Sequence, residues 1–254
     1  IRAAQAGGKV LKEYFNKTLN PKEKTTPADM QTEADIGSEQ AILEILKIEF
    51  PGYNINSEES GNSNKNSIYT FCVDPLDGTN NFVMGIPNFT VSIGLAKNDQ
   101  LIAGVVYQPI LDQTYYAEAG QGAFLNGKII KVSSHTEISN LTIALSFPYI
   151  TDKNKANAIK NILALMYPKR VVIQWSIAND LCLLASGKID CMINHTGNLH
   201  DFAAGKLIAV EAGAKLISFD GIPDTATTKD KFIISNNDLV NRQIFEKIKD
   251  FLTA

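Results

Sequence analysis

The residues best suited to do chemistry lie in the segment DPLDGTNNF, which begins at Asp74 and follows an apolar run typical of a buried strand. Pro75 fixes its own φ angle and Gly78 allows a tight turn, so the chain can bend here. The carboxylates of Asp74 and Asp77 and the carbonyl of Leu76 can then point toward one place. Such oxygens are the ligands that Mg²⁺ prefers. The segment therefore predicts a Mg²⁺ site, although an Asp-Pro or Asp-Gly pair alone is also an ordinary turn.

Two further acidic positions could join this site. Glu58 begins the triplet EES after a loop that contains Pro and Gly, and Asp201 directly precedes the apolar stretch 202–208. Adjacent glutamates in a loop are usually solvated, and Asp201 is also well placed as a helix N-cap. Several carboxylates from separate segments, without zinc-ligand spacing, are typical of sites for hard divalent cations. His200 is interpreted as a packing or supporting residue beside Asp201 rather than as a ligand.

The elements that must position these residues follow from hydrophobic periodicity. The first part of the chain predicts two helices and then short strands separated by Gly, Pro and Asn, which favours an antiparallel sheet. Asn126-Gly127 supplies a two-residue hairpin turn, and the Asn-rich stretch 61–66 is expected to be a loop. The expected helices are 3–15 and 37–50, and the expected strands are 68–73, 90–96, 101–107, 114–119, 122–125 and 128–133.

Beyond residue 135 the pattern changes to alternating strands and helices. This alternation is typical of an α/β arrangement. The expected strands are 141–147, 171–173, 191–193, 215–219 and 231–235, and the expected helices are about 154–165, 178–186, 202–212 and 238–252.

Composition restricts the class of protein. With 254 residues, 44% hydrophobic and 20% charged, the chain can bury a large core and is not expected to be disordered. Its formal net charge of −3 gives no basic field that would attract a nucleic-acid polymer or anionic lipid. The apolar runs fall well short of the roughly 20 residues that cross a bilayer. Neither nucleic acid nor a membrane is therefore an expected partner.

The cysteines and the first residues bear on localisation. Cys72, Cys182 and Cys191 are odd in number and lack CxxC spacing, which favours reduced, buried thiols in a cytoplasmic protein. The chain opens on the amphipathic stretch AAQAGGKVLKEYF, which is typical of a shortened first helix. A removed signal peptide stays an open alternative.

Three segments together carry a family resemblance. The triplet EES at Glu58, DPLDGTNNF at Asp74 and HDFAAGKLIAVEAGA at His200 resemble, in this order, the signatures of the inositol monophosphatase-like family of Mg²⁺-dependent, lithium-sensitive phosphatases. Upstream, residues 24–29 are similar to the family's mobile loop and residues 32–35 to its T-x-x-D element. The resemblance covers essentially the whole chain.

The resemblance implies an α/β (α+β) fold, a layered αβαβα sandwich of the sugar-phosphatase type. An α+β half with an antiparallel sheet would span residues 1–136, and an α/β half would span residues 137–254. The metal site would lie between the two halves.

The resemblance also assigns roles to individual residues. Asp29, in the mobile loop, resembles a residue that contributes to the more weakly held ion. Asp35 and Thr79 carry over as the pair that activates the attacking water, because a Thr hydroxyl bound to a carboxylate can take up a proton and pass it on. Gly78 and Thr79 would offer backbone N–H groups to a phosphate oxygen. The implied ligands of two or three Mg²⁺ ions are Glu58, which also counts as catalytic, Asp74, the Leu76 carbonyl, Asp77 and Asp201.

Three positions depart from the family pattern, one of which is His200, where the family commonly has Trp. A Glu that contacts sugar hydroxyls in the inositol-specific members is replaced by Asn194, and the Gly of the family's G-[ST]-A-A segment is replaced by Trp175, which precedes Ser176. A Trp here could stack on a ring or close the pocket, and simple core filling is the alternative that we favour. The expected substrate-binding residues are Asp77, Gly78, Thr79, Trp175, Ser176, Asn194 and Asp201.

The predicted function is that of a Mg²⁺-dependent phosphomonoesterase that acts on a small polyol, sugar or nucleotide phosphate. Inositol monophosphate, histidinol phosphate, fructose bisphosphate and 3′-phosphoadenosine 5′-phosphate stay open as substrates, and the resemblance implies a homodimer. A non-catalytic module that binds metal and phosphate is the alternative from another class. Loss of a ligand or of Thr79 would favour that module, but the residues are all present.

Overall fold

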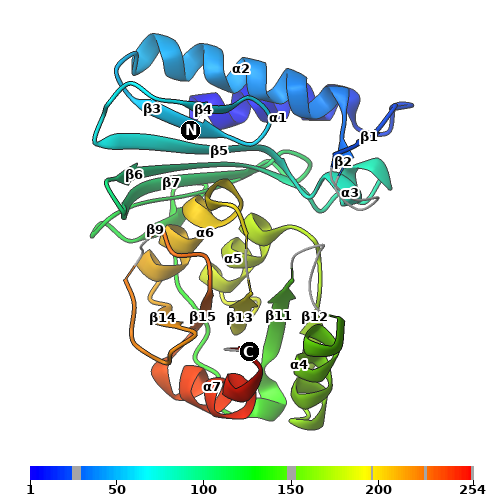
Figure 1. The fold of residues 1–254 in the computed structure, drawn as a ribbon, viewed down its shortest axis with the longest axis vertical. Coiled ribbons are helices and arrows are strands. Elements are labelled where there is room, and N and C mark those ends of the chain that lie inside the picture. Colours follow the sequence, from blue (N-terminus) through cyan, green and yellow to red (C-terminus); the bar gives the residue numbers. More distant parts are fainter. Residues whose placement is uncertain (25–29, 148–152, 196, 226–227, 253–254) are drawn as a thin grey trace.

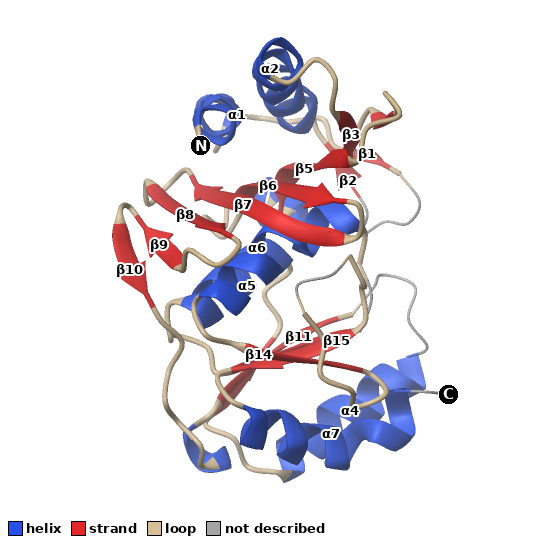
Figure 2. Ribbon diagram, turned by 90° about the vertical axis from the view of Figure 1, so that its left-hand side faces the viewer, coloured by secondary structure: helices blue, strands red, loops and turns tan. Residues whose placement is uncertain are grey.

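The computed structural model describes residues 1–24, 30–147, 153–195, 197–225 and 228–252, with the side chains of residues 153–156 excepted. Five layers follow one another: two helices, an eight-stranded sheet, two helices, a five-stranded sheet and two further helices. Figures 1 and 2 show α1 and α2 on one outer face of the molecule, α4 and α7 on the opposite outer face, and α5 and α6 between the sheets. The predicted αβαβα sandwich is confirmed.

The outer helices of the first layer are α1 (Arg2–Tyr14) and α2 (Glu33–Glu49). The second was predicted to begin at Gly37, which is wrong by one turn. Thr32 is the N-cap of α2, and its hydroxyl accepts a hydrogen bond from the Ala34 N–H at 3.1 Å. The Asp35 carboxylate returns to the Thr32 N–H at 2.7 Å. This capping box starts the helix before its apolar stripe begins.

The larger sheet has the order β10-β9-β8-β7-β6-β5-β3-β4. Its neighbours pair antiparallel except for β3 and β5, which run parallel, so the expectation of an antiparallel sheet was incomplete. The Asn126-Gly127 hairpin is confirmed by φ angles of 47° and 80°, whereas part of the expected loop 61–66 is strand β4. The strands are β3 (Asn54–Ser57), β4 (Gly61–Ser63), β5 (Tyr69–Asp77), β6 (Thr90–Lys97), β7 (Gln100–Gln108), β8 (Gln113–Glu118), β9 (Ala123–Leu125) and β10 (Lys128–Ile130).

The smaller sheet has the order β12-β11-β13-β15-β14, in which β12, β11 and β13 run parallel and the last two pairings are antiparallel. Its alternation of strands and helices follows the predicted pattern. Short elements complete the chain: β1 (Lys22–Glu23), β2 (Met30–Gln31), α3 (Thr79–Val83) and a 3-10 turn (Ile138–Asn140). The elements of this half are β11 (Thr142–Ser146), α4 (Lys153–Leu165), β12 (Arg170–Val172), α5 (Ile177–Ala185), β13 (Cys191–Asn194), α6 (Leu199–Glu211), β14 (Lys215–Ser218), β15 (Phe232–Ser235) and α7 (Asp238–Leu252).

The middle helix α6 packs closely on the larger sheet because β6 and β7 each present a glycine to it. A Cβ on Gly94 would lie 2.8 Å from Ala203 Cβ, and a Cβ on Gly104 would lie 2.9 Å from Ala204 Cα. Both distances are too short for a side chain, so the helix could not approach this closely over alanines. The contact fixes the height of the first turn of α6, and with it Asp201, above the sheet.

The core and the cysteines agree with the sequence. Buried apolar side chains form one cluster under α1 and α2, one around α5 and α6, and one under α4 and α7. All three cysteines are free and buried, as predicted. Within the described ranges, every helix is too short or too polar to cross a bilayer. The division of the chain near residue 136 stays a prediction.

Candidate active site

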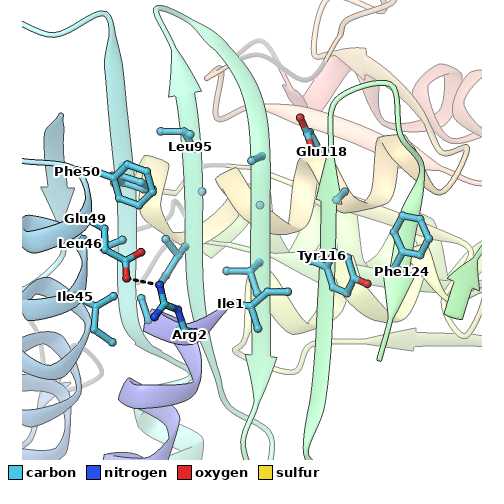
Figure 3. Close-up of a pocket in the computed structure, with 18 of the residues that line it drawn as sticks. Ile1, Arg2, Ile45, Leu46, Glu49, Phe50, Leu95, Tyr116, Glu118 and Phe124 are labelled. Atoms are coloured by element: carbon cyan, nitrogen blue, oxygen red, sulfur yellow. Dashed lines mark hydrogen bonds and ion pairs between the residues drawn. The ribbon is translucent and has the colours of Figure 1, made fainter. Parts of the chain in front are cut away.

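A cavity of about 490 Å³ opens where strand ends from both sheets meet. Most of the residues singled out in the sequence line it: Glu58, Asp74, Leu76, Asp77, Gly78, Thr79, Trp175, Ser176 and Asp201. A second cavity of about 450 Å³ lies between the ends of α1 and α2 and the larger sheet (Figure 3). Its lining is mainly apolar, the Arg2–Glu49 ion pair aside, and the two cavities share no residue. The first cavity therefore holds the candidate site.

The parallel pair β3–β5 brings Glu58 beside Asp74. Ser57 pairs with Val73 in the register, and the Glu58 N–H donates to the Val73 carbonyl at 3.0 Å. The chain direction is the same in both strands, so the residues that follow them emerge at the same edge. From α2, Glu39 accepts hydrogen bonds at 3.1 Å from the backbone N–H groups after Glu58, which shapes the turn.

Lys24 supplies a positive charge next to Glu58. Its ammonium lies 2.9 Å from Glu58 Oε1 and 2.6 Å from Glu59 Oε1. Burial nevertheless raises the pKa of Glu58, and Lys24 opposes that rise. The pKa of Asp74 is raised well above its ordinary value by burial and then by the charges of Glu58, Asp77 and Asp201. Negative charge is therefore crowded at this end of the cavity.

Asp77 is held by the first turn of α5. Its Oδ1 accepts from the Ile177 N–H at 3.0 Å, and its Oδ2 accepts from the Ala178 N–H at 3.0 Å and from the Ser176 hydroxyl at 2.6 Å. The exposed N–H groups of a helix N-terminus favour such an anion. Burial still dominates over these bonds and raises the pKa of Asp77 to about 7. Because α5 belongs to the second half of the chain, this carboxylate joins the two halves.

Asp35 and Thr79 are in contact, as the T-x-x-D resemblance implied. Thr79 Oγ1 lies 3.2 Å from Asp35 Oδ1 and 3.1 Å from the Leu76 carbonyl oxygen. The other oxygen, Asp35 Oδ2, accepts from the N–H and hydroxyl of Thr32 at 2.7 and 2.6 Å. Asp35 has no exposed surface, and this burial raises its pKa to about 7 despite the bonds from Thr32.

Asp201 has the same local arrangement at the start of α6. The predicted alternative, Asp201 as an N-cap, is wrong by three residues: Asn198 is the N-cap and Asp201 is the third helical residue. Asp201 Oδ2 accepts from the Asn198 N–H at 2.8 Å, and Oδ1 lies 3.1 Å from His200 Nε2. His200 is buried here, where the sequence predicted a supporting residue.

Comparison with known proteins decides the family. The sequence profile of the Inositol monophosphatase family matches residues 1–251. The chain belongs to the inositol monophosphatase family. It is 31% identical to "Inositol-1-monophosphatase" of Mesorhizobium japonicum over all of this chain and 96% of the relative. It is 35% identical to "Fructose-1,6-bisphosphatase/inositol-1-monophosphatase" of Aquifex aeolicus over 83% of this chain and 81% of the relative.

A solved structure agrees with the sequence relatives. The crystal structure of extragenic suppressor protein suhB from Bartonella henselae superposes with a TM-score of 0.90 at 30% identity, covering 97% of this chain and 95% of that one. Membership of the inositol monophosphatase family makes this protein a phosphatase, a metal-dependent hydrolase of phosphomonoesters. A small phosphorylated substrate is consistent with membership of this family.

At the other end of the cavity, Trp175 takes the position of the family glycine. Its φ is +56°, in the left-handed region that favours glycine, and the residue is 56% exposed. Core filling, the favoured alternative in the sequence, is therefore wrong. Trp175 lines the cavity instead.

Two predicted residues do not join the others. Asn194 is fully buried, donates to the Asp230 carbonyl at 2.6 Å and is not part of the cavity lining. It ends β13 opposite Phe232 of β15, and its amide reaches the Asp230 carbonyl instead of the cavity. Asp29 lies outside the described residues. Its role stays a prediction.

Sequence reasoning missed ten residues that line the cavity, among them Phe147, Lys160, Ile173 and Asp180. Phe147 and Ile173 directly follow β11 and β12, so a parallel-strand pairing would have located them. Asp180 offered a signal, because it is an acidic residue inside the otherwise apolar helix α5. Its pKa is raised to about 8 by burial and then by the charge of Asp77. Lys160 gave no signal in the sequence.

Proposed function

We propose that this phosphatase uses two to three Mg²⁺ ions. The residues proposed to hold them are Glu58, Asp74, the Leu76 carbonyl, Asp77 and Asp201, with Asp29 for the most weakly held ion. The donor set supports the choice of metal, since it contains only hard oxygens. No carboxylate of the set except Glu58 has an ion pair with Lys or Arg among the described side chains.

The charges in the cavity fit cations of this kind. Asp74 is buried, and its Oδ1 accepts a hydrogen bond from the Leu76 N–H at 2.9 Å. Buried carboxylates this close to each other are costly unless a cation compensates them. In the described part of the chain no three acidic, His or Cys side chains converge on one point at ligand distance. Bound Mg²⁺ would supply positive charge to these carboxylates, where Lys24 supplies it only to Glu58 and Glu59.

Bound Mg²⁺ would polarise the phosphate, lower the pKa of the attacking water and neutralise charge on the leaving oxygen. The protein's own residues Thr79 and Asp35 are proposed to transfer the proton. The Thr79 hydroxyl can donate to Asp35 Oδ1 while its lone pairs accept a proton from water. As Thr79 takes up the proton from water it would release its own hydroxyl proton to Asp35, whose pKa, raised to about 7 by burial, suits it to receive a proton near neutral pH.

The remaining proposed contacts are with the substrate. Gly78 and Thr79 would bind a phosphate oxygen, and Asp77, Ser176 and Asp201 would face the alcohol. Gly78 has a φ of +98°, and a Cβ there would lie 2.9 Å from the Asn88 carbonyl oxygen, so no other residue gives this turn without strain. The same turn directs Asp77 and Thr79 to one side of the chain.

Further properties of the proposal come from the family resemblance and the sequence. We propose inhibition by Li⁺ through one of the metal positions, a homodimer, cytoplasmic localisation and no nucleic-acid or membrane partner. A non-catalytic module is not favoured, because Glu58, Asp74, Asp77, Thr79 and Asp201 are all retained and all line one cavity.

The observation that carries the proposal is the meeting of these carboxylates with the Asp35–Thr79 pair at one cavity. The test is phosphate release by the purified protein from inositol 1-phosphate, histidinol phosphate, fructose 1,6-bisphosphate and 3′-phosphoadenosine 5′-phosphate, with Mg²⁺, with chelator, and with Mg²⁺ plus Li⁺. We expect turnover that depends on Mg²⁺ and is reduced by Li⁺. Full turnover in chelator would contradict the metal role.

A further inference from the structure

The alcohol end of the cavity, the end lined by Trp175, contains a strained backbone turn. Trp175 has a φ of +56°, a left-handed conformation that is costly for a bulky L-residue. The residue is 56% exposed, so core packing does not offset this cost. Strain of this kind persists only where the surrounding structure over-determines the backbone. The bonds that hold the turn must therefore lie on either side of Trp175.

The residues that follow Trp175 hold the carboxylate of Asp77. The Ser176 hydroxyl donates to Asp77 Oδ2 at 2.6 Å. The N–H groups of Ile177 and Ala178 donate to the same carboxylate, each at 3.0 Å. Because Trp175 directly precedes these donors, a change in its backbone angles would move all of them together. The orientation of Asp77 therefore depends on the conformation of Trp175.

On the other side of Trp175, two asparagine amides converge on one carbonyl. Asn81 Nδ2 donates to the Gln174 carbonyl at 2.7 Å, and Asn88 Nδ2 donates to the same oxygen at 3.1 Å. Both asparagines come from the connection between β5 and β6, whereas Gln174 lies between β12 and α5. The carbonyl directly before the strained residue is thus fixed by two donors from a distant segment.

Asn88 links the strained turn to the turn at Gly78. Its carbonyl accepts from Asn81 Nδ2 at 2.8 Å and lies against Gly78, where a Cβ would be 2.9 Å from the same oxygen. Its side-chain Oδ1 accepts from Asn179 Nδ2, in the first turn of α5. The Asn88 side chain therefore binds on both sides of the strained residue, while its backbone contacts the Gly78 turn.

Four residues form this arrangement, which we call the amide clamp: Asn81, Asn88, Gln174 and Asn179. We propose that Asn88 is a positioning residue, which keeps the Asp77 carboxylate oriented for the metal ions by holding the start of α5 against the Gly78 turn. None of the clamp residues belongs to the described lining of the cavity, so the clamp acts through Asp77 rather than on the substrate. This inference rests on the proposed Mg²⁺-dependent phosphatase function.

The first test removes the side chain of Asn88. Loss of a group that orients a metal ligand typically costs about ten- to a hundredfold in metal affinity or activity. In Asn88→Ala, we therefore expect kcat to fall by about tenfold or more and the Mg²⁺ midpoint of phosphate release to rise several-fold. The measurement is a Mg²⁺ titration of phosphate release with the best of the substrates above, alongside thermal unfolding in chelator.

Asn241→Ala is the matched control. Asn241 is buried, and its Nδ2 donates to the Lys215 carbonyl at 2.9 Å, but it lies on α7, on an outer face of the molecule (Figure 1). Its replacement should lower the melting temperature and leave kcat and the Mg²⁺ midpoint unchanged. The pair of variants separates positioning of Asp77 from the stability that any buried amide supplies.

The strained residue gives a second readout, which a general loss of stability would not move. Trp175→Gly allows the positive φ without strain, so the turn depends less on the clamp. We expect Asn88→Ala to cost several-fold less in kcat in the Trp175→Gly background than in wild type. Asn179→Ala removes only the bond to Asn88 Oδ1, so it should give a smaller loss with the same dependence on the background. It replaces Asn88→Ala if that variant does not fold.

The outcomes distinguish this inference from the phosphatase proposal. Absence of phosphate release by the wild-type protein would contradict the proposed function and, with it, the positioning role. With an active wild type, unchanged kcat and Mg²⁺ midpoint in Asn88→Ala, or in Asn179→Ala where it takes its place, would overturn the positioning role alone. An equal loss of kcat in Asn241→Ala, or a loss of the same size with and without Trp175→Gly, would also overturn it.

Discussion

At the carboxylate end of the cavity, Asp35, Asp77 and Asp201 each accept hydrogen bonds from backbone N–H groups at the start of a helix. At the alcohol end, Trp175 and Ile173 are 56% and 42% exposed and border open space. The first end is fixed by backbone geometry from both halves of the chain. The second is built from side chains that follow strand ends and can change without disturbing the fold. Catalytic chemistry and substrate choice are thus carried by regions under different structural constraint.

The largest effect should come from breaking the carboxylate end at Asp77. Asp77→Asn keeps one oxygen for the N–H groups of α5 but loses the negative charge, so we expect phosphate release to fall by about a hundredfold or more, roughly 2.7 kcal/mol. The measurement is kcat at saturating Mg²⁺. Asp99→Asn, in the exposed β6–β7 turn, is the control and should have no effect. A variant of Asp77 within about tenfold of wild type would contradict a metal-binding role.

Asp201 tests whether one carboxylate serves both the helix and the metal. Asp201→Asn should keep the bond to the Asn198 N–H and unfold near the wild-type temperature, yet lose most turnover and require more Mg²⁺, because an amide binds Mg²⁺ poorly. Asp201→Ala should also lose about 0.5–2 kcal/mol of stability. Thermal unfolding without metal and a Mg²⁺ titration of phosphate release measure the two roles separately. Asp238→Asn in the first turn of α7 is the control. Wild-type rate and Mg²⁺ midpoint in Asp201→Asn would leave only the helix role.

Asp180 sharpens the comparison, because it lies in the same cavity but is bound by Gln174 rather than by backbone N–H groups. Burial raises its pKa to about 8, and that of Asp35 to about 7. The folded protein keeps these protons where the unfolded chain, with an Asp pKa of about 3.9, has released them. The free energy of unfolding of the metal-free protein therefore falls as pH rises from about 4 to about 8, by at most roughly 1.4 kcal/mol per unit for each group.

The measurement is the melting temperature of wild type and Asp180→Asn at about pH 5 and about pH 7.5 in chelator. The variant should gain stability over wild type, and the gain should be larger at the higher pH. An equal difference at both pH values would mean that Asp180 titrates normally in the fold.

The smallest effect concerns spacing rather than charge. Gly94→Ala forces α6 away from β6, since the new Cβ would meet Ala203 Cβ at 2.8 Å. We expect a loss of about 1–3 kcal/mol in stability and a several-fold loss of kcat/KM through displacement of Asp201. Gly52→Ala is the control, because a Cβ there meets nothing within 4 Å. An unchanged rate in a destabilised Gly94→Ala would show that the helix position does not limit the site.

Much of the fold and of the carboxylate end could be predicted from sequence because both depend on local patterns. Turn residues, strand runs and short acidic motifs are visible along the chain, so Asp74, Asp77 and Thr79 were found together. The parallel pairing of β3 and β5 could not be predicted in this way, because register and direction depend on contacts between distant segments. Three of the missed residues at the alcohol end share this cause. Phe147 and Ile173 become neighbours only through the pairing of β11 with β12, and Lys160 only through the packing of α4.

Errors at single residues have the same origin. The sequence identified Asp201 as functional but assigned it the wrong place in its helix, because the first turn of α6 begins before the apolar pattern does. Asn194 was matched to the family's Glu by its place in the sequence, but its side chain is fully buried. Trp175 was matched to a family glycine, but core filling was favoured from its residue type, and the backbone angle and the exposure of the residue contradict that choice.

Asp35 and Asp201 share one arrangement: each is the third residue of its helix, one oxygen bound to the N-cap N–H and the other directed at a neighbouring side chain. If the first turn of either helix frays, the functional oxygen moves with it while the rest of the helix stays packed. First turns open at lower free energy than the core. Enzyme activity should therefore report on local opening, and in a urea titration phosphate release should be lost before the far-ultraviolet circular dichroism of the fold.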